Sequence, residues 1–317
     1  MTESFSIVIP SYNGLKRLEQ NLPSIVRAAE KTARSYEIVI SDDGSTDGTL
    51  EWLAKQYPAV RTVSSAANAG FIAAANRGVA AASFEIVMLL NNDVRPEEGC
   101  FILVFTHFDD SETFAVTFKS LYPDSLLFRE GAKSARFRFG FLKILHAERH
   151  FPAPLNDGRI PSLYPVGGHC AIRKSMFKEL GGFDDLFAPF YWEDADLGWR
   201  GWKAGWKTVY EPAAVVVHDE QGTIKDLHGA AKARQVRYRN RLLFMWKNIS
   251  DWKLRFLHAV FLALRVILSW AIGNIGFYSQ WIEARTRRNK MLSARIPSLR
   301  ESKGLSDSGV LRLFKKR

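Results

Sequence analysis

Acidic side chains follow several apolar runs of this sequence, at positions where carboxylates hold cations or take up protons. Asp42 and Asp43 come directly after one run and Asp93 follows another, whereas residues 193–196 read Glu-Asp-Ala-Asp and His218 ends a late run. Carboxylates are hard oxygen ligands for divalent cations, and both carboxylates and imidazoles act as general bases. The pattern therefore predicts cation binding and proton transfer.

Three familiar kinds of motif are missing from the sequence. No Gly-x-Gly-x-x-Gly follows the first apolar run, and no Gly-x-x-x-x-Gly-Lys-Ser/Thr occurs. A Ser-His-Asp or Cys-His signature is also lacking, so nothing indicates a covalent nucleophile. The dinucleotide fingerprint and the phosphate loop are excluded, and a ligand must be held in another way.

The first part of the chain alternates between strand and helix patterns. Short β-branched and apolar runs predict buried strands at residues 5–9, 36–41, 60–63 and 86–90. Apolar residues at three- and four-residue spacings predict helices at 15–29, 49–56 and 73–82. Such alternation is typical of an α/β fold with a mostly parallel central sheet flanked by helices, whose function lies at the carboxyl ends of the strands.

The pattern weakens between residues 117 and 163, where Pro, Gly and a basic-aromatic stretch at 136–150 indicate a loop-rich insertion. Regular signals then return. We expect strands at 166–173, 208–210 and 214–218, and helices at 174–180 and 194–204.

Length and composition limit the class of protein. The 317 residues are 47% apolar, which suits one large globular domain or two small ones. Cys100 and Cys170 are the only cysteines, so a disulfide scaffold and a Cys-rich zinc module are excluded. Residues 1–6 are short and polar and lack the features of a signal peptide, which favours a cytoplasmic location.

The charge is divided unequally along the chain. The formal net charge is +11, yet residues 225–317 hold 21 Lys and Arg against 5 Asp and Glu. The preceding residues hold 23 basic and 28 acidic side chains. A mildly acidic body therefore carries a strongly basic C-terminal region, and the two parts call for separate interpretations.

The acidic motifs belong to an ordered set of blocks, and through these blocks the chain resembles family 2 glycosyltransferases of the GT-A fold, rhamnosyltransferase-like proteins among them. The resemblance covers about residues 5–245. It is carried by residues 7–14, 41–49, 68–71, 76–78, 89–93, 167–168, 181–184, 193–200, 218 and 239–241. The family is inverting and uses nucleotide-sugar donors, and its members include proteins of bacterial surface polysaccharide synthesis.

The resemblance implies a nucleotide pocket. Asp43 matches the carboxylate that accepts a hydrogen bond from uracil or thymine, Asp42 is its neighbour, and Pro10 and Tyr12 form the wall. Further donor-binding residues implied by the blocks are Asn13, Asn68, Gly70, Asn76, Asn92 and Asp93. From the residues alone, the Asp-Asp-Gly-Ser segment also fits an Asx-type turn.

A divalent cation, Mg²⁺ or Mn²⁺, is implied as well, because it would neutralise the charge that develops on a diphosphate leaving group. Asp93 matches the last carboxylate of the family Asp-x-Asp motif, and His218 matches its distal metal-ligating histidine. Asn91 and Asn92 depart from the motif, although an Asn carbonyl can ligate a hard cation without adding charge. Alternatively, Asn91 to Asp93 form a polar turn that ends a buried strand.

Asp194 matches the family's general base, which takes the proton of the acceptor hydroxyl during inverting transfer. Glu193 and Asp196 would orient Asp194 or raise its pKa through like charge. The alternative is an acidic first helical turn that opposes the helix dipole. On the acceptor side we expect Tyr191, Trp192 and His169, and most other aromatic residues nearby should lie in the core. Each of the three arginines in the 237–241 segment either reaches a phosphate or lies on a solvated helix surface.

The basic region contains an apolar stretch at 254–272. On a helical wheel its polar residues gather in one narrow stripe, namely Arg255, His258, Arg265 and Ser269 with Leu262. A spanning helix would place Arg265 at depth, so the pattern favours a helix lying on an anionic membrane over one crossing it. A soluble helix packed on the catalytic domain or in a dimer is the alternative. A second apolar stretch at 275–282 precedes more basic residues.

We therefore expect a catalytic domain at residues 1–245, with a nucleotide-binding half at 1–116 and an acceptor half at 117–245. Residues 246–317 form a basic region of amphipathic helices, likewise expected at the membrane. The leading hypothesis is an inverting, metal-dependent glycosyltransferase on the inner face of the cell membrane. It moves a sugar from a UDP or dTDP donor, with dTDP-rhamnose as the family-level choice, to a lipid-linked or polysaccharide acceptor, and it does not bind nucleic acid. The alternatives are an inactive homologue acting as a membrane scaffold and a basic nucleic-acid-binding protein.

Overall fold

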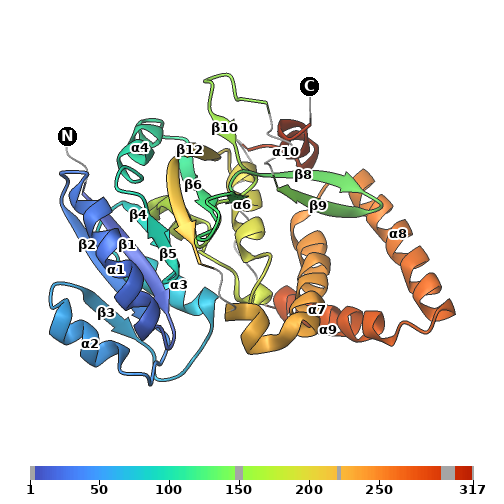
Figure 1. Cartoon of the computed structure of the whole chain (residues 1–317). Helices are drawn as coiled ribbons and strands as arrows, with labels where there is room; N and C mark the ends of the chain where they lie inside the picture. The colour runs from blue at the N-terminus through green and yellow to red at the C-terminus, as the bar shows by residue number, and fades with distance from the viewer. Residues whose placement is uncertain (1–3, 147–152, 220–222, 294–303, 316–317) are drawn as a thin grey trace.

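The structure is a computed structural model that describes residues 4–146, 153–219, 223–293 and 304–315. A ten-stranded sheet forms its centre, with strands in the order β10-β12-β6-β11-β4-β1-β2-β3, while β5 pairs with β12 and β7 with β6 (Figure 1). The first strand shows why both faces are covered, because Phe5, Ile7 and Ile9 enter one hydrophobic core and Val8 enters the other. The expected α/β fold class is confirmed.

The N-terminal half follows the predicted alternation closely. Its elements are β1 (Phe5–Ser11), α1 (Leu15–Glu30), β2 (Tyr36–Asp42), α2 (Thr49–Gln56), β3 (Arg61–Ser64), α3 (Phe71–Ala81), β4 (Ile86–Leu90), β5 (Val94–Pro96) and α4 (Ile102–Phe105). Strands β3, β2, β1 and β4 pair in parallel. Their carboxyl ends therefore meet at one edge of the sheet, where the Asp42 and Asp93 segments lie.

The second half extends the same sheet. Its elements are β6 (Thr113–Leu121), β7 (Phe128–Glu130), β8 (Lys133–Arg138), β9 (Phe141–His146), β10 (Ile160–Pro161), β11 (His169–Arg173), α5 (Lys174–Glu179), α6 (Glu193–Lys203) and β12 (Lys207–His218). Strand β11 is antiparallel to both β4 and β6, so the sheet is mixed and is parallel only in part. Because β6 crosses residue 117, the expected halves share one continuous sheet.

The expectation of a loop-rich segment at 117–163 is wrong, since β6 to β10 occupy much of it. The β8–β9 hairpin turns through Phe139 and Gly140, whose φ angles are 50° and 72°. Two-residue hairpin turns with positive φ usually begin with Asn, Asp or Gly, and Phe at this position hides the signal. Gly140 is required here, because an added Cβ would come within 2.6 Å of Phe261 Cβ.

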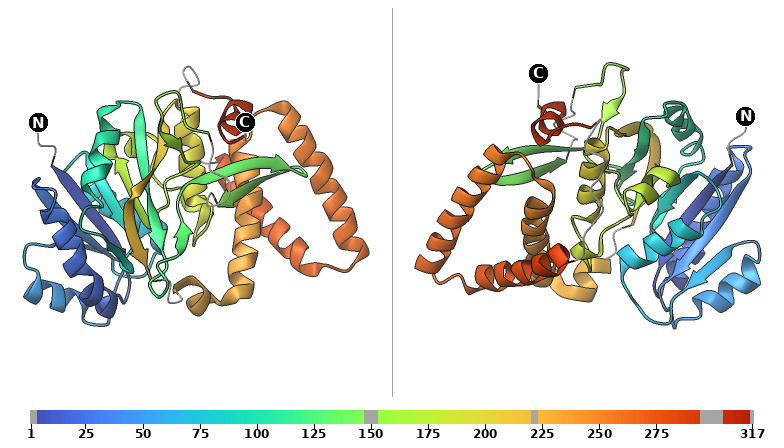
Figure 2. Two further views of the ribbon diagram at one scale, coloured as in Figure 1. Left: turned by 45° about the horizontal axis from the view of Figure 1, so that its top comes forward. Right: turned by 180° about the vertical axis from the view of Figure 1, so that it is seen from behind.

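Within the described part of the chain, four helices follow the sheet: α7 (Thr223–Asn248), α8 (Trp252–Ala271), α9 (Ile275–Ser293) and α10 (Asp307–Leu313). Helices α7, α8 and α9 stand beside the sheet as an open frame in both views of Figure 2. Leu242 and Phe244 of α7 enter the core, and Asp307 of α10 accepts hydrogen bonds from the amides of Ser250 and Asp251. The expected boundary at residue 245 falls within α7, so this helix joins both regions.

Candidate active site

Asp93 and His218 meet where β4 gives way to β5. The backbone causes this, because His218 is the last residue of β12 and pairs with Val94 at the start of β5. Asp93 Oδ1 lies 3.2 Å from His218 Nε2, and both side chains are buried. Arg129 donates a hydrogen bond to the His218 carbonyl oxygen and supports this end of the strand.

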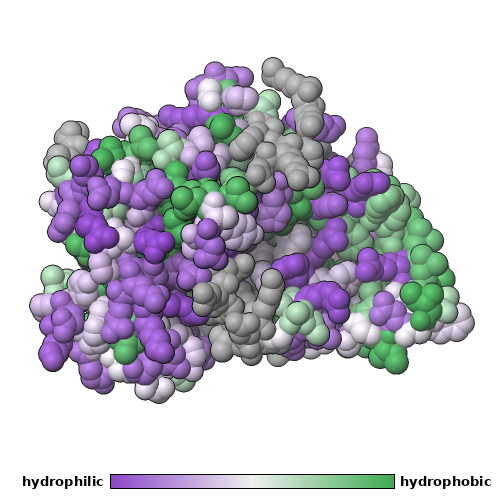
Figure 3. Space-filling view, in the orientation of Figure 1, coloured by the Kyte–Doolittle hydropathy of each residue, from purple (hydrophilic) through white to green (hydrophobic). Residues whose placement is uncertain are grey.

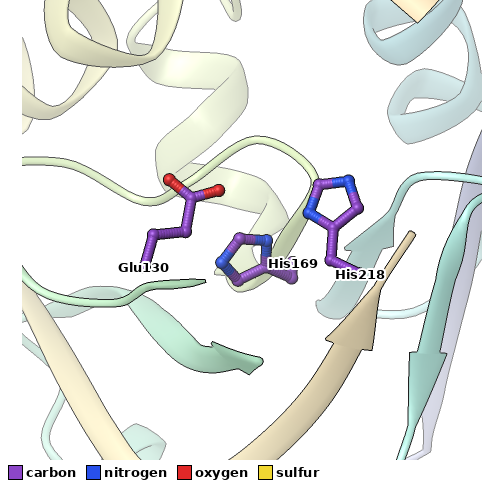
Figure 4. Close-up of side chains that lie close together, drawn as sticks. All are labelled: Glu130, His169 and His218. Carbon is purple, nitrogen blue, oxygen red and sulfur yellow. The ribbon is translucent and has the colours of Figure 1, made fainter. Parts of the chain in front are cut away.

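Two residues from neighbouring strands extend the pair. Glu130 ends β7 and His169 begins β11, and one ligand atom from each of Glu130, His169 and His218 lies within 4.8 Å of the others (Figure 4). Among the described residues, Asp93 Oδ1, His218 Nδ1 and both His169 ring nitrogens are buried without a hydrogen-bond partner. Buried polar atoms are normally satisfied, so this cluster fits a divalent cation.

The charge state of the cluster also suits a cation. Burial lowers the pKa of His169 to about 3, which keeps its ring neutral and able to act as a ligand. Burial alone would raise the pKa of Glu130, but the charge and hydrogen bond of Lys133, together with the electrostatic effects of His169 and His218, outweigh burial, and the pKa falls below its usual range. Lys133 Nζ lies 2.6 Å from Glu130 Oε2 and 3.0 Å from His146 Nδ1.

Asn91 and Asn92 brace the turn before Asp93. Asn92 Nδ2 donates to Ser11 Oγ over 3.0 Å, and the Asn91 amide lies against Gly168, where an added Cβ would come within 2.6 Å of it. Asp93 is the residue of this turn that contacts a histidine of the cluster.

The loop after β2 is organised by its two aspartates. Asp43 accepts hydrogen bonds from the amides of Ala69 and Gly70 at 3.0 and 2.7 Å, and from Ser65 Oγ at 3.1 Å. Asp42 Oδ2 caps the turn at Gly44 and Ser45, as the Asx-turn alternative requires. Asp43 was expected to accept a hydrogen bond from the base, but both its oxygens are engaged within the chain. Asp42 Oδ1 is buried without a partner among the described residues, so Asp42 is the aspartate with an acceptor left for a ligand.

The other donor-side residues surround this loop. Asn13 Oδ1 accepts from the Thr46 amide, and Asn68 Oδ1 accepts from the Gly70 amide. Tyr12, which follows Pro10 and Ser11 of β1, is 38% exposed. A flat, accessible aromatic ring beside a set of fixed loop amides is suited to stacking on a base.

The expected donor contact of Asn76 is wrong. Its Nδ2 donates to the Phe183 carbonyl oxygen at 2.8 Å, and its Oδ1 accepts from the Phe183 amide at 2.9 Å. The side chain thus ties α3 to the turn before α6, and both its polar atoms are used within the chain.

Asn76→Ala is therefore expected to lower the free energy of unfolding by about 1–3 kcal/mol, the usual cost of leaving such groups unpaired. Urea denaturation measures this loss, and nucleotide affinity should stay unchanged. If Asn76→Ala bound nucleotide more weakly at unchanged stability, Asn76 would be a donor-binding residue after all.

Glu193 and Asp194 open α6, and their pKa values are shifted in the same direction. Burial raises the pKa of Asp194 to about 7, although the Ala195 amide donates a hydrogen bond to its Oδ1. Burial, and then the charge of Asp194, raises the pKa of Glu193 well above its usual range. The charges of Lys133 and Glu130 also act on Asp194, which places this carboxyl near the histidine cluster.

Asp196 was expected to orient Asp194 or to raise its pKa, but its carboxylate is engaged with other partners. Its carboxylate is fully buried between Arg200 at 2.6 Å and Lys247 at 2.7 Å, and it accepts a further hydrogen bond from Asn248. Burial opposes its ionisation, but these cations lower its pKa. These contacts bind it into the fold, and its charge contributes to the raised pKa of Glu193.

The aromatic residues before α6 differ in accessibility. Trp192 is 8% exposed and packs on Phe244, so it belongs to the core rather than to the acceptor side. Tyr191 is partly buried, and the Arg237 guanidinium lies 4.4 Å from its ring centre. His169, expected on the acceptor side, lies in the cluster with Glu130 and His218 instead.

The C-terminal helices hold the segment that leads into α6. Asn240 Nδ2 donates to the carbonyl oxygens of Phe187, Phe190 and Tyr191 at 2.6 to 3.0 Å. Arg239 of α7 and Arg287 of α9 both donate to the Ala188 carbonyl oxygen. Tyr191 and Trp192 have positive φ angles of 71° and 78°, a conformation that needs such support.

Sequence reasoning missed Glu130 and Lys133 as site residues. Neither lies in a recognisable block, and pairing of β7 with β6 and of β8 with β9 brings them to the cluster. The arginines at 239 and 241 were left between phosphate binding and a solvated surface. Arg239 binds Glu283, and Arg241 donates to the Leu142 carbonyl oxygen, so both serve the fold.

Comparison with known proteins agrees with this fold. The family model for glycosyl transferase family 2 matches residues 6–181, and the chain belongs to this family. It is 29% identical over 297 residues to the N-acetylglucosaminyl-diphospho-decaprenol L-rhamnosyltransferase of Mycobacterium tuberculosis, covering 80% of this chain and 90% of that one. It is 28% identical to the pre-mycofactocin glycosyltransferase of the same species, over 70% of this chain and 44% of that protein.

Solved structures share the fold. Staphylococcus aureus TarS 1-349 in complex with UDP-GlcNAc superposes with a TM-score of 0.59 at 16% identity, covering 89% of this chain and 79% of that one. The mannosyltransferase PcManGT of Pyrobaculum calidifontis, in complex with GDP-Man and Mn²⁺, gives 0.55 at 16% identity and covers 93% and 86%. These matches establish a GT-A type fold.

Proposed function

We propose that this glycosyltransferase transfers a sugar with inversion from a UDP or dTDP donor, with dTDP-rhamnose as the leading candidate, to a lipid-linked or polysaccharide acceptor in cell-surface glycan synthesis. The observation that carries the proposal is the pairing of Asp93 with His218, with the raised-pKa carboxyl of Asp194 close to the same cluster. The rhamnosyltransferase relative, matched over nearly its full length, supports the choice of sugar and acceptor.

The residues divide the work between donor and acceptor. Asp42, Asn13 and Tyr12 would bind the base and ribose, and Asp43 would hold the loop that carries Asn68 and Gly70. Asp93 and His218, joined by His169 and Glu130, would hold Mn²⁺ or Mg²⁺, which when bound supplies positive charge against the leaving diphosphate. Asp194 would take the proton of the acceptor hydroxyl.

The properties of helix α8 support the proposal that this protein lies on the inner face of the membrane. Among the described helices, α8 is the one that is long enough and apolar enough to span a bilayer. Its polar stripe faces the protein, since His258 and Ser269 are buried and Arg265 lies 4.7 Å from the Tyr238 ring centre. Its apolar side faces outward, with Trp270 78% exposed, and forms the green ridge in Figure 3. A helix on the surface of a soluble domain turns its apolar face toward the core. The apolar face of α8 points outward instead, which suits the lipid interface.

The test is release of nucleoside diphosphate from a panel of UDP- and dTDP-sugars, with Mn²⁺ or Mg²⁺ and a polyprenyl-diphosphate-linked sugar as acceptor. We expect dTDP-rhamnose to be consumed and the product to carry the opposite anomeric configuration by NMR. Donor binding without turnover of any sugar would favour the inactive scaffold instead.

The pH dependence of transfer follows from Asp194. A general base must be ionised, and the pKa of Asp194 is raised to about 7. We therefore expect kcat/KM to fall about tenfold per pH unit below an apparent pKa near 7. Initial rates between pH 5 and pH 9 measure this limb. A kcat/KM that stays level down to pH 5 would assign the proton transfer to a carboxyl of ordinary pKa.

A further inference from the structure

A small pocket lies between α7, α8 and α9, separate from the residues of the active site. Its volume is about 190 Å³, and Met245, Ile249 and Leu262 contribute apolar walls. Arg255 of α8 and Arg288 of α9 line the same pocket. The pocket therefore combines an apolar lining with two permanent positive charges.

The two guanidinium groups have no carboxylate partner among the described residues. Two acidic side chains of this region whose contacts are described are engaged elsewhere, because Glu283 pairs with Arg239 and Arg287, and Asp251 caps α8. Arg288 instead lies 5.6 Å from the ring centre of Trp246. Two like charges that face one cavity repel each other, and a bound anion would relieve that repulsion.

His258 also lines the pocket, but its ring is already used. Trp246 Nε1 donates to His258 Nε2 at 3.1 Å, and His258 Nδ1 lies 2.8 Å from the Gly140 carbonyl oxygen. The ring therefore fixes the hairpin to α8 and forms a wall. Arg255 and Arg288 are therefore the residues of the pocket that remain to bind an anionic ligand.

The position of Arg255 links the pocket to the membrane surface. It lies on α8 next to Phe256, which is 63% exposed, and two turns further along Leu264 is 48% exposed. A bilayer that covers this apolar side would bring lipid headgroups to the level of Arg255. The pocket volume is below the roughly 300–1,000 Å³ of sites for drug-sized ligands, so it suits a headgroup rather than a whole nucleotide-sugar.

We propose that this pocket binds the phosphomonoester headgroup of a membrane lipid through Arg255 and Arg288. Guanidinium forks match phosphate oxygens, and two of them balance the charge of a phosphomonoester. This inference rests on the membrane placement proposed above, and it adds a discrete site to a general electrostatic attraction.

The test compares binding to phosphatidylcholine vesicles that contain phosphatidic acid or phosphatidylserine at matched surface potential. The pocket variant is Arg255→Gln with Arg288→Gln. The control is Lys253→Gln with Arg285→Gln, which removes the same charge from the same two helices at exposed residues that do not line the pocket. Thermal melts and dTDP binding verify that both variants are folded.

Wild type and the control are expected to prefer phosphatidic acid by about tenfold, a difference of about 1.4 kcal/mol, and the pocket variant should lose this preference. Equal binding of wild type to both vesicles, or a preference that survives in the pocket variant, would overturn the pocket while leaving the membrane placement intact. Failure of wild type to bind any vesicle would refute the membrane placement, and the pocket proposal with it. If inorganic phosphate bound wild type as tightly as phosphatidic acid does, the lipid assignment would be wrong.

Discussion

Asp194→Asn is expected to lower kcat by about 10²–10⁴-fold, the usual contribution of a general base, with little change in donor KM. Asn has nearly the same shape as Asp and retains a hydrogen-bond acceptor for the Ala195 amide, but it cannot take up a proton. Steady-state kinetics with saturating donor measure the effect. Asp185→Asn, at an exposed position in the segment before α6, is the matched control and should keep wild-type activity.

The same substitution should not destabilise the protein. The pKa of Asp194 is raised from 3.8 to about 7 in the folded state, so the folded state binds this proton more tightly than the unfolded state. Stability is therefore lost as pH rises through this window, and Asn removes that loss. A melting temperature at pH 8 at or above that of wild type is expected. A large decrease together with lost activity would make Asp194 a structural residue.

Asp196→Ala, two residues away, is expected to have the opposite profile. Removing this carboxylate leaves Arg200 buried without its counter-charge and takes one of two carboxylate partners from Lys247, which also pairs with Asp184. Breaking such a buried pair costs about 3–5 kcal/mol. Urea denaturation followed by circular dichroism measures the loss. Asp196→Asn keeps hydrogen-bond capacity and should lose less.

The protein that remains folded should retain activity. If Asp196→Ala were as stable as wild type but inactive, Asp196 would belong to the catalytic machinery after all. The two aspartates thus separate catalysis from stability within one turn of α6.

Much of the fold was predictable because its signals are local. The runs that form β1 and β4 and the periodicity of α1 are read within a few residues, and their alternation defines the parallel part of the sheet. Asp93 and His218 were found because each stands at the end of such a run. No local signal indicated that β12 would pair with β5 and bring the two side chains within 3.2 Å.

The rest depends on contacts between distant segments. Glu130 and Lys133 become site residues only through strand pairing, and Asn76 was misassigned because its partner, Phe183, is 107 residues away. Periodicity identified the polar stripe of α8 correctly. It did not show that the stripe faces the protein and the apolar side faces outward, because a helical wheel carries no information about neighbours.

The most direct test of the account is calorimetric titration with dTDP and UDP, with and without Mn²⁺ or Mg²⁺, on wild type and on Asp93→Ala. We expect one of the nucleotides to bind in the micromolar range only when the cation is present, and we expect Asp93→Ala to lose this dependence. Binding that is equally tight without a cation, or unchanged in Asp93→Ala, would contradict a cation-assisted donor site at Asp93 and His218.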